Sequence, residues 1–321
     1  MKDYTIVFGC CAEDYTYYQK TKTADVSFGG KGGNQAIAHA KAGRKTIMLT
    51  KFSSMPSEKE STERQLKNFK KHKVCVKYIA YDNQHRNEQT RVLVDMGGDN
   101  TMEEIKDMSN TYTIDYVHKN EKLIKNANFL ILQLKIPNEV TREIFKVCKK
   151  YNIKTCLTPC RVHKARENMD FIEDATFITL NKKEITHIFG KEKNGGFSLT
   201  DKQIDNILKK YPNKIILTLG EKGVKYHNGQ EIVTIPAINI ENVVNTTGAG
   251  DTFCGNFVAC LLDGDDITTA IQKGICASTI NIQSEGTQNG MPYKKERDAL
   301  HTKVFKENVK WLNLEQAVSE E

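Results

Sequence analysis

Short apolar runs alternate with helical patterns along the 321-residue chain, and this alternation restricts the fold more than any other feature. Runs of apolar and β-branched residues bounded by polar turns predict short buried strands. The segments between them carry apolar residues at helical spacing. Such alternation is typical of a mostly parallel sheet with helices on both faces. We therefore predict an α/β, doubly wound fold whose ligands bind beyond the carboxyl ends of the strands.

The predicted elements follow from these patterns. Strands are expected at 5–11, 46–52, 74–80, 128–134, 153–157, 176–180 and 214–219. Helices are expected at 32–43, 57–73, 138–151, 252–262 and 266–282. Two polar segments with scattered β-formers, at about 12–28 and 89–104, break the alternation and predict a small side sheet. We expect one domain over 1–321 with this appendage, not two independent domains.

Composition limits the classes of protein to which the chain can belong. The formal net charge of +7 comes mainly from lysines spread along the chain, which favours a solvated surface over nucleic-acid binding. None of the nine cysteines forms a CxxC pair or a zinc-like Cys/His cluster, and free thiols are typical of a reducing compartment. The N-terminus lacks a signal-peptide pattern, and no apolar run approaches the length of a membrane span. We expect a cytoplasmic protein that binds neither nucleic acid nor a membrane.

The segment Asn245–Phe253, with the sequence NTTGAGDTF, is the strongest local motif. A turn of small residues runs directly into an apolar helix, whose free N–H groups and dipole favour anionic oxygens. Gly248 and Gly250 allow the backbone to approach a phosphate without a Cβ clash. Asp251 has two interpretations: an ordinary N-cap, or a base that accepts a proton from an attacking hydroxyl. Phosphoryl transfer requires an anion hole beside a base, although the chain has no Walker-type GxxxxGK(S/T) loop.

A second glycine-rich segment, Phe28–Ala36 with the sequence FGGKGGNQA, also opens a predicted helix. By itself it is compatible with a flexible loop. Asn34 lies one turn into an alanine-rich helix, where its amide can donate to and accept from sugar hydroxyls.

In their order and separation, these two segments resemble the two signatures of the ribokinase-like (phosphofructokinase-B) carbohydrate kinases. Within that family, the run FGGKGGNQA is most similar to the ribokinases. Asn181–Glu184 resembles the family's NxxE motif, Leu217–Val224 its nucleotide-binding strand and turn, and Gln133–Pro137 the end of its central substrate-side strand. The resemblance covers nearly the whole chain and implies an ATP-dependent kinase that phosphorylates a sugar hydroxymethyl group.

The resemblance also implies roles for individual residues. Asp251 would deprotonate the sugar hydroxymethyl group. The γ-phosphate would be held by the N–H groups of Gly248, Ala249 and Gly250. Residues expected to face the sugar are Asp14, Gly30, Lys31, Asn34 and Lys135. Residues expected at the nucleotide are Asn181, Thr218, Gly220 and Gly223. The two polar segments would form a lid that closes and excludes water.

Two cations follow from the same resemblance. Mg²⁺ would accompany ATP, with Glu184 acting on it through water, because bound magnesium retains several waters. Many relatives are also activated by K⁺ beside the anion hole, and the corresponding positions here are Asn245, Thr247 and Gly286. Asn245 stands where an aspartate is usual, so this site keeps an oxygen but loses a charge.

The chain departs from the family pattern where the acceptor binds. Ala12 replaces a substrate-side asparagine, and the first lid segment is shorter than in ribokinases. Lys135 replaces a glutamate that accepts hydrogen bonds from sugar hydroxyls, and a lysine can only donate. Three alternatives stay open: a kinase for ribose or a related sugar, including an anionic sugar paired with Lys135; a nucleoside kinase; and a degenerate relative that binds nucleotide without transfer. Because relatives often pair through their lids and this lid is short, a monomer and a homodimer are both compatible with the sequence.

Overall fold

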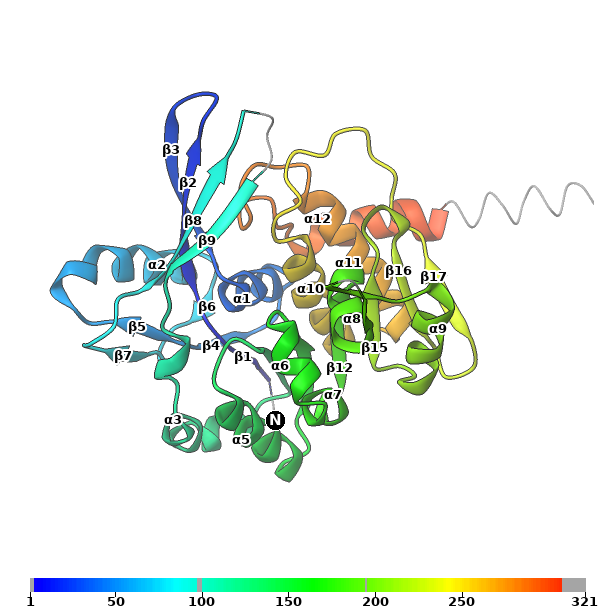
Figure 1. Cartoon of the computed structure of the whole chain (residues 1–321), viewed down its shortest axis with the longest axis horizontal. Helices are drawn as coiled ribbons and strands as arrows, with labels where there is room; N and C mark the ends of the chain where they lie inside the picture. Colours follow the sequence, from blue (N-terminus) through cyan, green and yellow to red (C-terminus); the bar gives the residue numbers. More distant parts are fainter. Residues whose placement is uncertain (1–2, 97–99, 194, 308–321) are drawn as a thin grey trace, which may run out of the picture.

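The computed structural model describes residues 3–96, 100–193 and 195–307. A nine-stranded sheet forms its centre, in the order β17-β16-β15-β12-β11-β10-β1-β4-β6 (Figure 1). The strands are β1 (Thr5–Phe8), β4 (Thr46–Leu49), β6 (Val74–Cys75), β10 (Phe129–Gln133), β11 (Lys154–Thr158), β12 (Phe177–Asn181), β15 (Ile215–Thr218), β16 (Val224–His227) and β17 (Ile232–Ile235). The strands from β15 to β6 pair in parallel, and β16 and β17 continue the sheet antiparallel. The predicted doubly wound, mostly parallel α/β class is confirmed.

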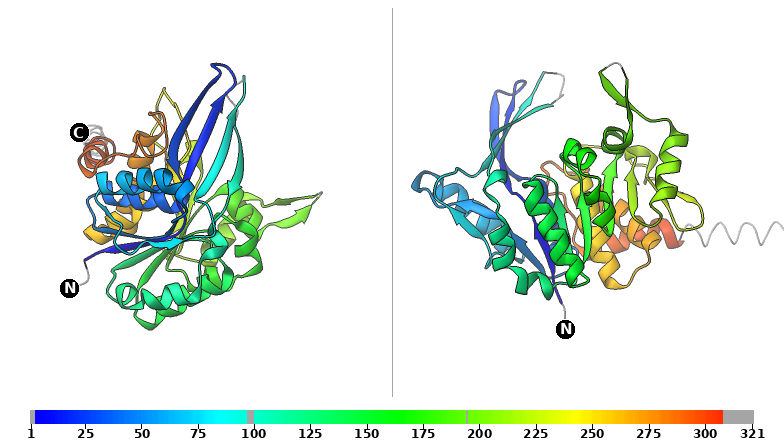
Figure 2. Two further views of the ribbon diagram at one scale, coloured as in Figure 1. Left: turned by 90° about the vertical axis from the view of Figure 1, so that its left-hand side faces the viewer. Right: turned by 60° about the horizontal axis from the view of Figure 1, so that its bottom comes forward.

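Helices cover both faces of this sheet, as the turned views in Figure 2 show. One face carries α1 (Lys31–Lys41), α2 (Lys59–Lys71), α10 (Ala249–Asp263) and α11 (Ile267–Asn281), with α12 (Lys294–His301) packed on α11. The other face carries α3 (Ile114–Lys119), α4 (Glu121–Lys125), α5 (Asn138–Lys150), α6 (Val162–Glu167), α7 (Asp170–Asp174), α8 (Lys182–Phe189) and α9 (Asp201–Lys210). Side chains of a strand alternate between its faces, so Ile6 and Phe8 of β1 enter one core and Val7 the other.

A second, smaller sheet projects from the main body in Figure 1, and its strand order is β3-β2-β8-β9. Its strands are β2 (Ala12–Tyr18), β3 (Thr23–Gly29), β8 (Glu88–Val94) and β9 (Asn100–Lys106). β2 pairs in parallel with β8, and the other two pairings are antiparallel. Because β2 follows the parallel strand β1 almost directly, this small sheet begins at the carboxyl edge of the large one. The two polar segments of the sequence are thus joined at the edge where ligands bind in such folds.

Two predicted strands are divided in the structure, and the strand predicted at 5–11 ends at Phe8 as β1. The run 46–52 divides into β4 and β5 (Lys51–Ser53), and the run 74–80 divides into β6 and β7 (Ala80–Asp82). β5 and β7 pair with each other in a separate two-stranded sheet. A turn interrupts the second run, where the Ile79 N–H donates to the Val76 carbonyl. A hairpin of β13 (Lys191–Lys193) and β14 (Gly196–Ser198) was not predicted.

Helix α10, which the sequence predicted as an apolar helix over 252–262, is buried on every side along most of its length. Residues 251–260 are all buried, because the helix lies between the sheet, α1 and α11. Gly255 permits the close approach of α1, since a Cβ there would lie 2.8 Å from the backbone nitrogen of His39. Within the described ranges, no helix is both long and apolar enough to cross a membrane.

Candidate active site

Two cavities lie at the carboxyl edge of the large sheet, on either side of the first turn of α10. The larger has a volume of about 840 Å³ and is lined by Asn181, Thr218, Gly220 and Gly223, the predicted nucleotide residues, together with Ala249 and Gly250. The smaller has a volume of about 550 Å³ and is lined by Asp14, Gly30, Lys31, Asn34 and Lys135, the predicted sugar residues, together with Thr247, Gly248 and Asp251. Consecutive residues of a single helical turn therefore border both cavities.

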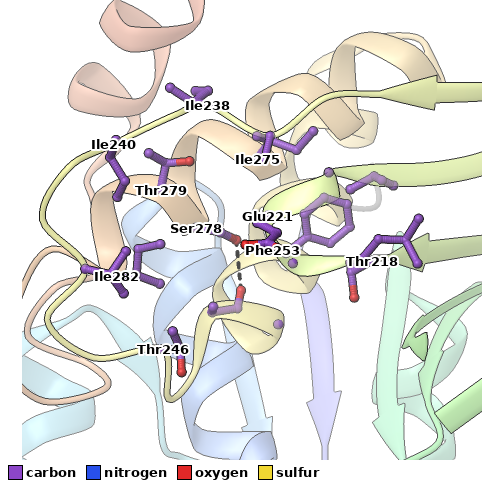
Figure 3. A pocket seen from close by; sticks show the side chains of 18 of the residues that line it. Thr218, Glu221, Ile238, Ile240, Thr246, Phe253, Ile275, Ser278, Thr279 and Ile282 are labelled. Carbon is purple, nitrogen blue, oxygen red and sulfur yellow. Dashed lines mark hydrogen bonds between the residues drawn. The ribbon is translucent and has the colours of Figure 1, made fainter. Parts of the chain in front are cut away.

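The larger cavity has mostly apolar walls with a polar end. Figure 3 shows Ile238, Ile240, Ile275, Ile282 and Phe253 around it, with Thr218 where β15 ends. Ser278 of α11 donates to the carbonyl of Ala249 at 2.9 Å and so ties α11 to the first turn of α10. Gly223 has a φ of 86°, and a Cβ there would lie 2.0 Å from the carbonyl oxygen of Ile235. The turn after β15 therefore requires glycine at this position.

Gly248 is the N-cap of α10 and adopts a left-handed conformation with φ of 81°. The first N–H groups of a helix have no partner within the helix and carry partial positive charge. The N–H of Ala249 donates to Thr246 O at 3.3 Å, whereas a Cβ added at Gly250 would meet none of the described atoms within 4 Å. The helix therefore begins at an open space that suits an anion.

Asp251 is not the N-cap, because Gly248 holds that place, and its side chain bonds to the neighbouring helix α1. Asn34 Nδ2 donates to its Oδ2 at 3.0 Å, and Gln35 Nε2 donates to its Oδ1 at 2.9 Å. Lys31 Nζ lies 4.0 Å from Oδ1, and the Asp251 charge raises the pKa of this lysine. Asp251 is only 4% exposed, but it lines the smaller cavity. A buried carboxylate that accepts hydrogen bonds from two side-chain amides at a helix N-terminus can accept a proton from a bound hydroxyl.

Gln35 is a site residue that sequence reasoning missed. Lys31, Asn34 and Gln35 lie at positions i, i+3 and i+4 of α1, so they share the face that meets Asp251. Gln133, the last residue of β10, donates to Gln35 Oε1 at 2.6 Å and so leaves the Gln35 amide group to donate. The spacing of the three polar residues within FGGKGGNQA was the available signal for this role.

Lys135 lies in the smaller cavity, but its charge is already paired. Its Nζ is 2.7 Å from Oε2 of Glu88 and 3.3 Å from Oε1 of Glu104, two residues of the small sheet. Burial opposes the charge of Lys135, yet the Glu88 carboxylate prevails and raises the pKa of the lysine. Arg161, after β11, pairs with Glu104 as well. Sequence reasoning missed Glu88, Glu104 and Arg161, since none belongs to a motif.

Asp14, Gly29 and Gly30 lie at the base of the hairpin formed by β2 and β3, away from its turn. The Asp14 carboxylate lies so close to Gly29 that a Cβ there would be 2.0 Å from Asp14 Oδ2. Burial raises the pKa of Asp14. Gly30 has a φ of 78°, and a Cβ on it would lie 2.7 Å from the backbone nitrogen of Ala12. Glycine at both positions therefore allows the acid to face the cavity.

The candidate cation ligands are divided between two places. Asn181 and Glu184 form a capping box at the start of α8, with Asn181 N donating to Glu184 Oε2 at 2.8 Å. Burial raises the pKa of Glu184, against the effect of Lys31. Asn245 Oδ1 accepts the N–H of Thr247 at 2.8 Å. Glu184, Asn245 and Gly286 are not among the residues that line either cavity. In the described ranges, no three His, Cys, Asp or Glu side chains gather into a metal-binding group.

Comparison with known proteins connects this geometry to a family. The model of the pfkB family carbohydrate kinases matches residues 4–294. A ribokinase from Lactococcus lactis is 33% identical over 268 residues, which cover 84% of this chain and 83% of the relative. A ribokinase from Bacillus subtilis is 31% identical over 272 residues, which cover 85% of this chain and 87% of the relative.

Solved structures agree on the fold. The ribokinase of Arabidopsis thaliana, complexed with ribose and ATP, superposes with a TM-score of 0.80 at 21% identity, over 94% of this chain and 99% of that one. The ribokinase of Thermotoga maritima gives a TM-score of 0.78 at 23% identity, over 92% and 98%. The chain belongs to the pfkB family of carbohydrate kinases, enzymes that transfer a phosphoryl group from ATP to a sugar.

Proposed function

We propose that this enzyme phosphorylates the hydroxymethyl group of ribose or a closely related neutral sugar, with Asp251 as the base. The observation that carries the proposal is the shared border of the two cavities. Ala249 and Gly250 line the larger one, while Gly248 and Asp251 line the smaller one. A phosphoryl group that passes from one cavity to the other would cross the N-terminus of α10.

On the donor side, the larger cavity suits a nucleotide. Its apolar walls favour a flat base, and its lining also includes the polar residues Asn181 and Thr218 and the helix start at Ala249 and Gly250, which would hold phosphates. Glu184 offers a carboxylate, the type of ligand that Mg²⁺ prefers, and would reach the ion through water. When bound with ATP, Mg²⁺ would neutralise part of the phosphate charge.

On the acceptor side, Asp251 would take the proton of the sugar hydroxyl while the hydroxyl oxygen forms a bond to the γ-phosphorus of ATP. The bond between the γ-phosphorus and the β-phosphate oxygen breaks, and ADP leaves with that oxygen. The N–H groups at the start of α10 would stabilise the charge on the transferred group. Lys31, whose Nζ lies 4.0 Å from Asp251 Oδ1, adds positive charge beside the base.

The charge balance of the smaller cavity favours a neutral acceptor. The cavity is lined by three cationic side chains (Lys31, Lys135 and Arg161) and three carboxylates (Asp14, Glu104 and Asp251), so the formal charge of its lining is zero. Glu88, paired with Lys135, adds one more negative charge beside it. An anionic sugar would therefore gain little from Lys135, because two glutamates already neutralise that lysine. The relatives named as ribokinases make ribose the first acceptor to test.

Potassium activation would be weak. The residues at the candidate site, Asn245, Thr247 and Gly286, offer only neutral oxygens, and the amide oxygen of Asn245 already accepts a hydrogen bond. A neutral, partly engaged set of oxygens fits a monovalent cation less well than a set that includes a carboxylate.

An acceptor screen tests the proposed function. Purified enzyme with Mg-ATP is offered ribose, 2-deoxyribose, ribose 5-phosphate and adenosine, and ADP formation is recorded. We expect ADP with ribose and little with ribose 5-phosphate. Preference for adenosine would assign a nucleoside kinase instead. If none of the acceptors leads to ADP formation at any K⁺ concentration, the result would favour a relative that binds nucleotide without transfer.

A further inference from the structure

The loop between α11 and α12, residues 282–293, reaches the site from a part of the chain outside both signature segments (orange in Figure 1). Lys41 Nζ of α1 donates to the carbonyls of Gln288 at 3.1 Å and Met291 at 2.8 Å. Asn281 Nδ2 donates to the Thr287 carbonyl at 2.8 Å. Thr287 and Gln288 are each 6% exposed. This loop is thus anchored and buried at its centre.

Three side-chain amides in series connect this loop to Asp251. Asn68 Nδ2 of α2 donates to Gln288 Oε1 at 2.7 Å, and Gln288 Nε2 donates to Asn34 Oδ1 at 2.9 Å. Asn34 Nδ2 then donates to Asp251 Oδ2 at 3.0 Å. An amide has one accepting end and one donating end, so each bond decides which end faces the next residue. With its oxygen bonded to Gln288, Asn34 has to turn its N–H groups toward the carboxylate.

The neighbouring residue of the same loop contacts the other half of the site. A Cβ added at Gly248 would lie 2.1 Å from Thr287 Cγ2, so Thr287 packs directly against the N-cap of α10. Thr287 and Gln288 therefore contact the helix start and the amide beside the base at the same time. Their placement suits a loop that aligns both.

We propose that Gln288 is a positioning residue for phosphoryl transfer, which holds the Asn34 amide with its N–H groups toward Asp251. A reversed Asn34 would direct its carbonyl oxygen at the carboxylate, and the repulsion would turn the base away from the acceptor hydroxyl. Gln288 lines neither cavity and would act through Asn34. The inference rests on the proposed function, since its effect is on turnover.

Two substitutions at Gln288 test this role. Gln288→Glu keeps the shape and still accepts from Asn68, but it cannot donate to Asn34. We expect kcat for ribose to fall roughly tenfold to a hundredfold, the range expected when a reacting group is misplaced, with KM for ATP unchanged. Gln288→Met removes both ends of the amide without adding a charge. This variant should also lower kcat, and it provides the test if Gln288→Glu does not fold.

Lys41→Met is the matched control, because Lys41 anchors the backbone of the same loop without entering the amide series. It should lower the Tm and leave kcat close to that of the wild type. If the wild type turns over ribose and both Gln288 variants keep its kcat, the positioning role is wrong while the proposed function stands. Equal losses of kcat in Lys41→Met and Gln288→Met would also overturn it, because loop anchoring alone would then explain the effect. A wild type without acceptor-dependent ADP would overturn both proposals.

Discussion

Lys135 Nζ lies 2.7 Å from Glu88 Oε2, so a cation at the end of the central strand β10 is joined to the base of the small sheet. Glu88 is 3% exposed on its side chain and Lys135 18%, which makes this a largely buried pair. The anionic-sugar hypothesis needed a free lysine, and this contact removes its basis. The pair instead connects the large sheet to the strands above the smaller cavity.

Breaking the pair should destabilise the protein. Lys135→Met leaves the buried Glu88 without its partner, and loss of one member of a buried pair costs about 3–5 kcal/mol in unfolding free energy. Urea unfolding measures the loss, and the double variant Lys135→Met/Glu88→Met should recover much of it. Lys150→Met removes an exposed pair with Glu121 and serves as the control, with a Tm close to that of the wild type. A Lys135→Met variant as stable as the wild type would show that the pair contributes nothing.

Asp251→Ala should lower kcat by roughly 10²–10⁴-fold while leaving ATP binding intact, because only proton transfer is lost. Steady-state kinetics and ATP titration measure the two effects separately. The control is Asp266→Ala, which removes a true N-cap: Asp266 Oδ1 accepts the N–H of Thr269 at 2.9 Å at the start of α11. That change should cost about 1 kcal/mol of stability and spare turnover. Similar kinetics for the two variants would remove Asp251 from the chemistry.

Gly248→Ala should reduce both stability and activity. An alanine there would need a left-handed backbone and would place Cβ against Thr287. Gly264, the C-cap of α10, has a φ of 93°, but a Cβ on it would meet none of the described atoms within 4 Å. Gly264→Ala should therefore lower the unfolding free energy only by the cost of a left-handed backbone at alanine, about 1–2 kcal/mol, and leave kcat unchanged. Thermal unfolding and kinetics compare the two, and an active Gly248→Ala enzyme would argue against an anion hole at this turn.

Asn245→Asp should increase the response to K⁺. The substitution restores a negative charge beside neutral oxygens, and cations bind carboxylates more strongly than amides. Turnover is measured with KCl against choline chloride at constant ionic strength. Equal K⁺ responses of the variant and the wild type would place any activating cation elsewhere.

Stability should fall as the pH decreases below neutrality. Burial lowers the pKa of His39 from its usual 6.5 to about 3. Between these values the unfolded chain binds a proton that the folded protein does not, so the unfolding free energy falls with decreasing pH, by about 1.4 kcal/mol per pH unit for this group. Urea unfolding at pH 7 and pH 5 tests this. In His39→Asn, the difference in unfolding free energy between pH 7 and pH 5 should be smaller. His72 should account for part of the remaining difference, because burial lowers the pKa of His72 to about 4. An unchanged difference in the variant would exclude His39 as a source.

The sequence predicted the architecture well because its signals are local. Apolar runs and helical spacing predicted the seven parallel strands of the large sheet and the helices α1, α2, α5, α10 and α11, but not the antiparallel strands β16 and β17 or the other helices. Two motifs identified Asp251 and Asn34 as site residues. The exact strand ends could not be predicted, since a turn at Val76 and the pairing of β5 with β7 depend on neighbours distant in sequence. The same limit applies to Glu88 and Gln288. Each is a single polar residue in an unremarkable segment, and only tertiary contacts bring it to the site.

The helix that carries Asp251 is embedded on every side, and two amides of α1 hold its carboxylate. A group so immobilised cannot travel to meet an incoming sugar, so the sugar has to be delivered to it. The small sheet would then be the part of the protein that moves in each catalytic cycle. The rate at which Glu88 and Glu104 separate from Lys135 would then set how quickly sugar enters and product leaves.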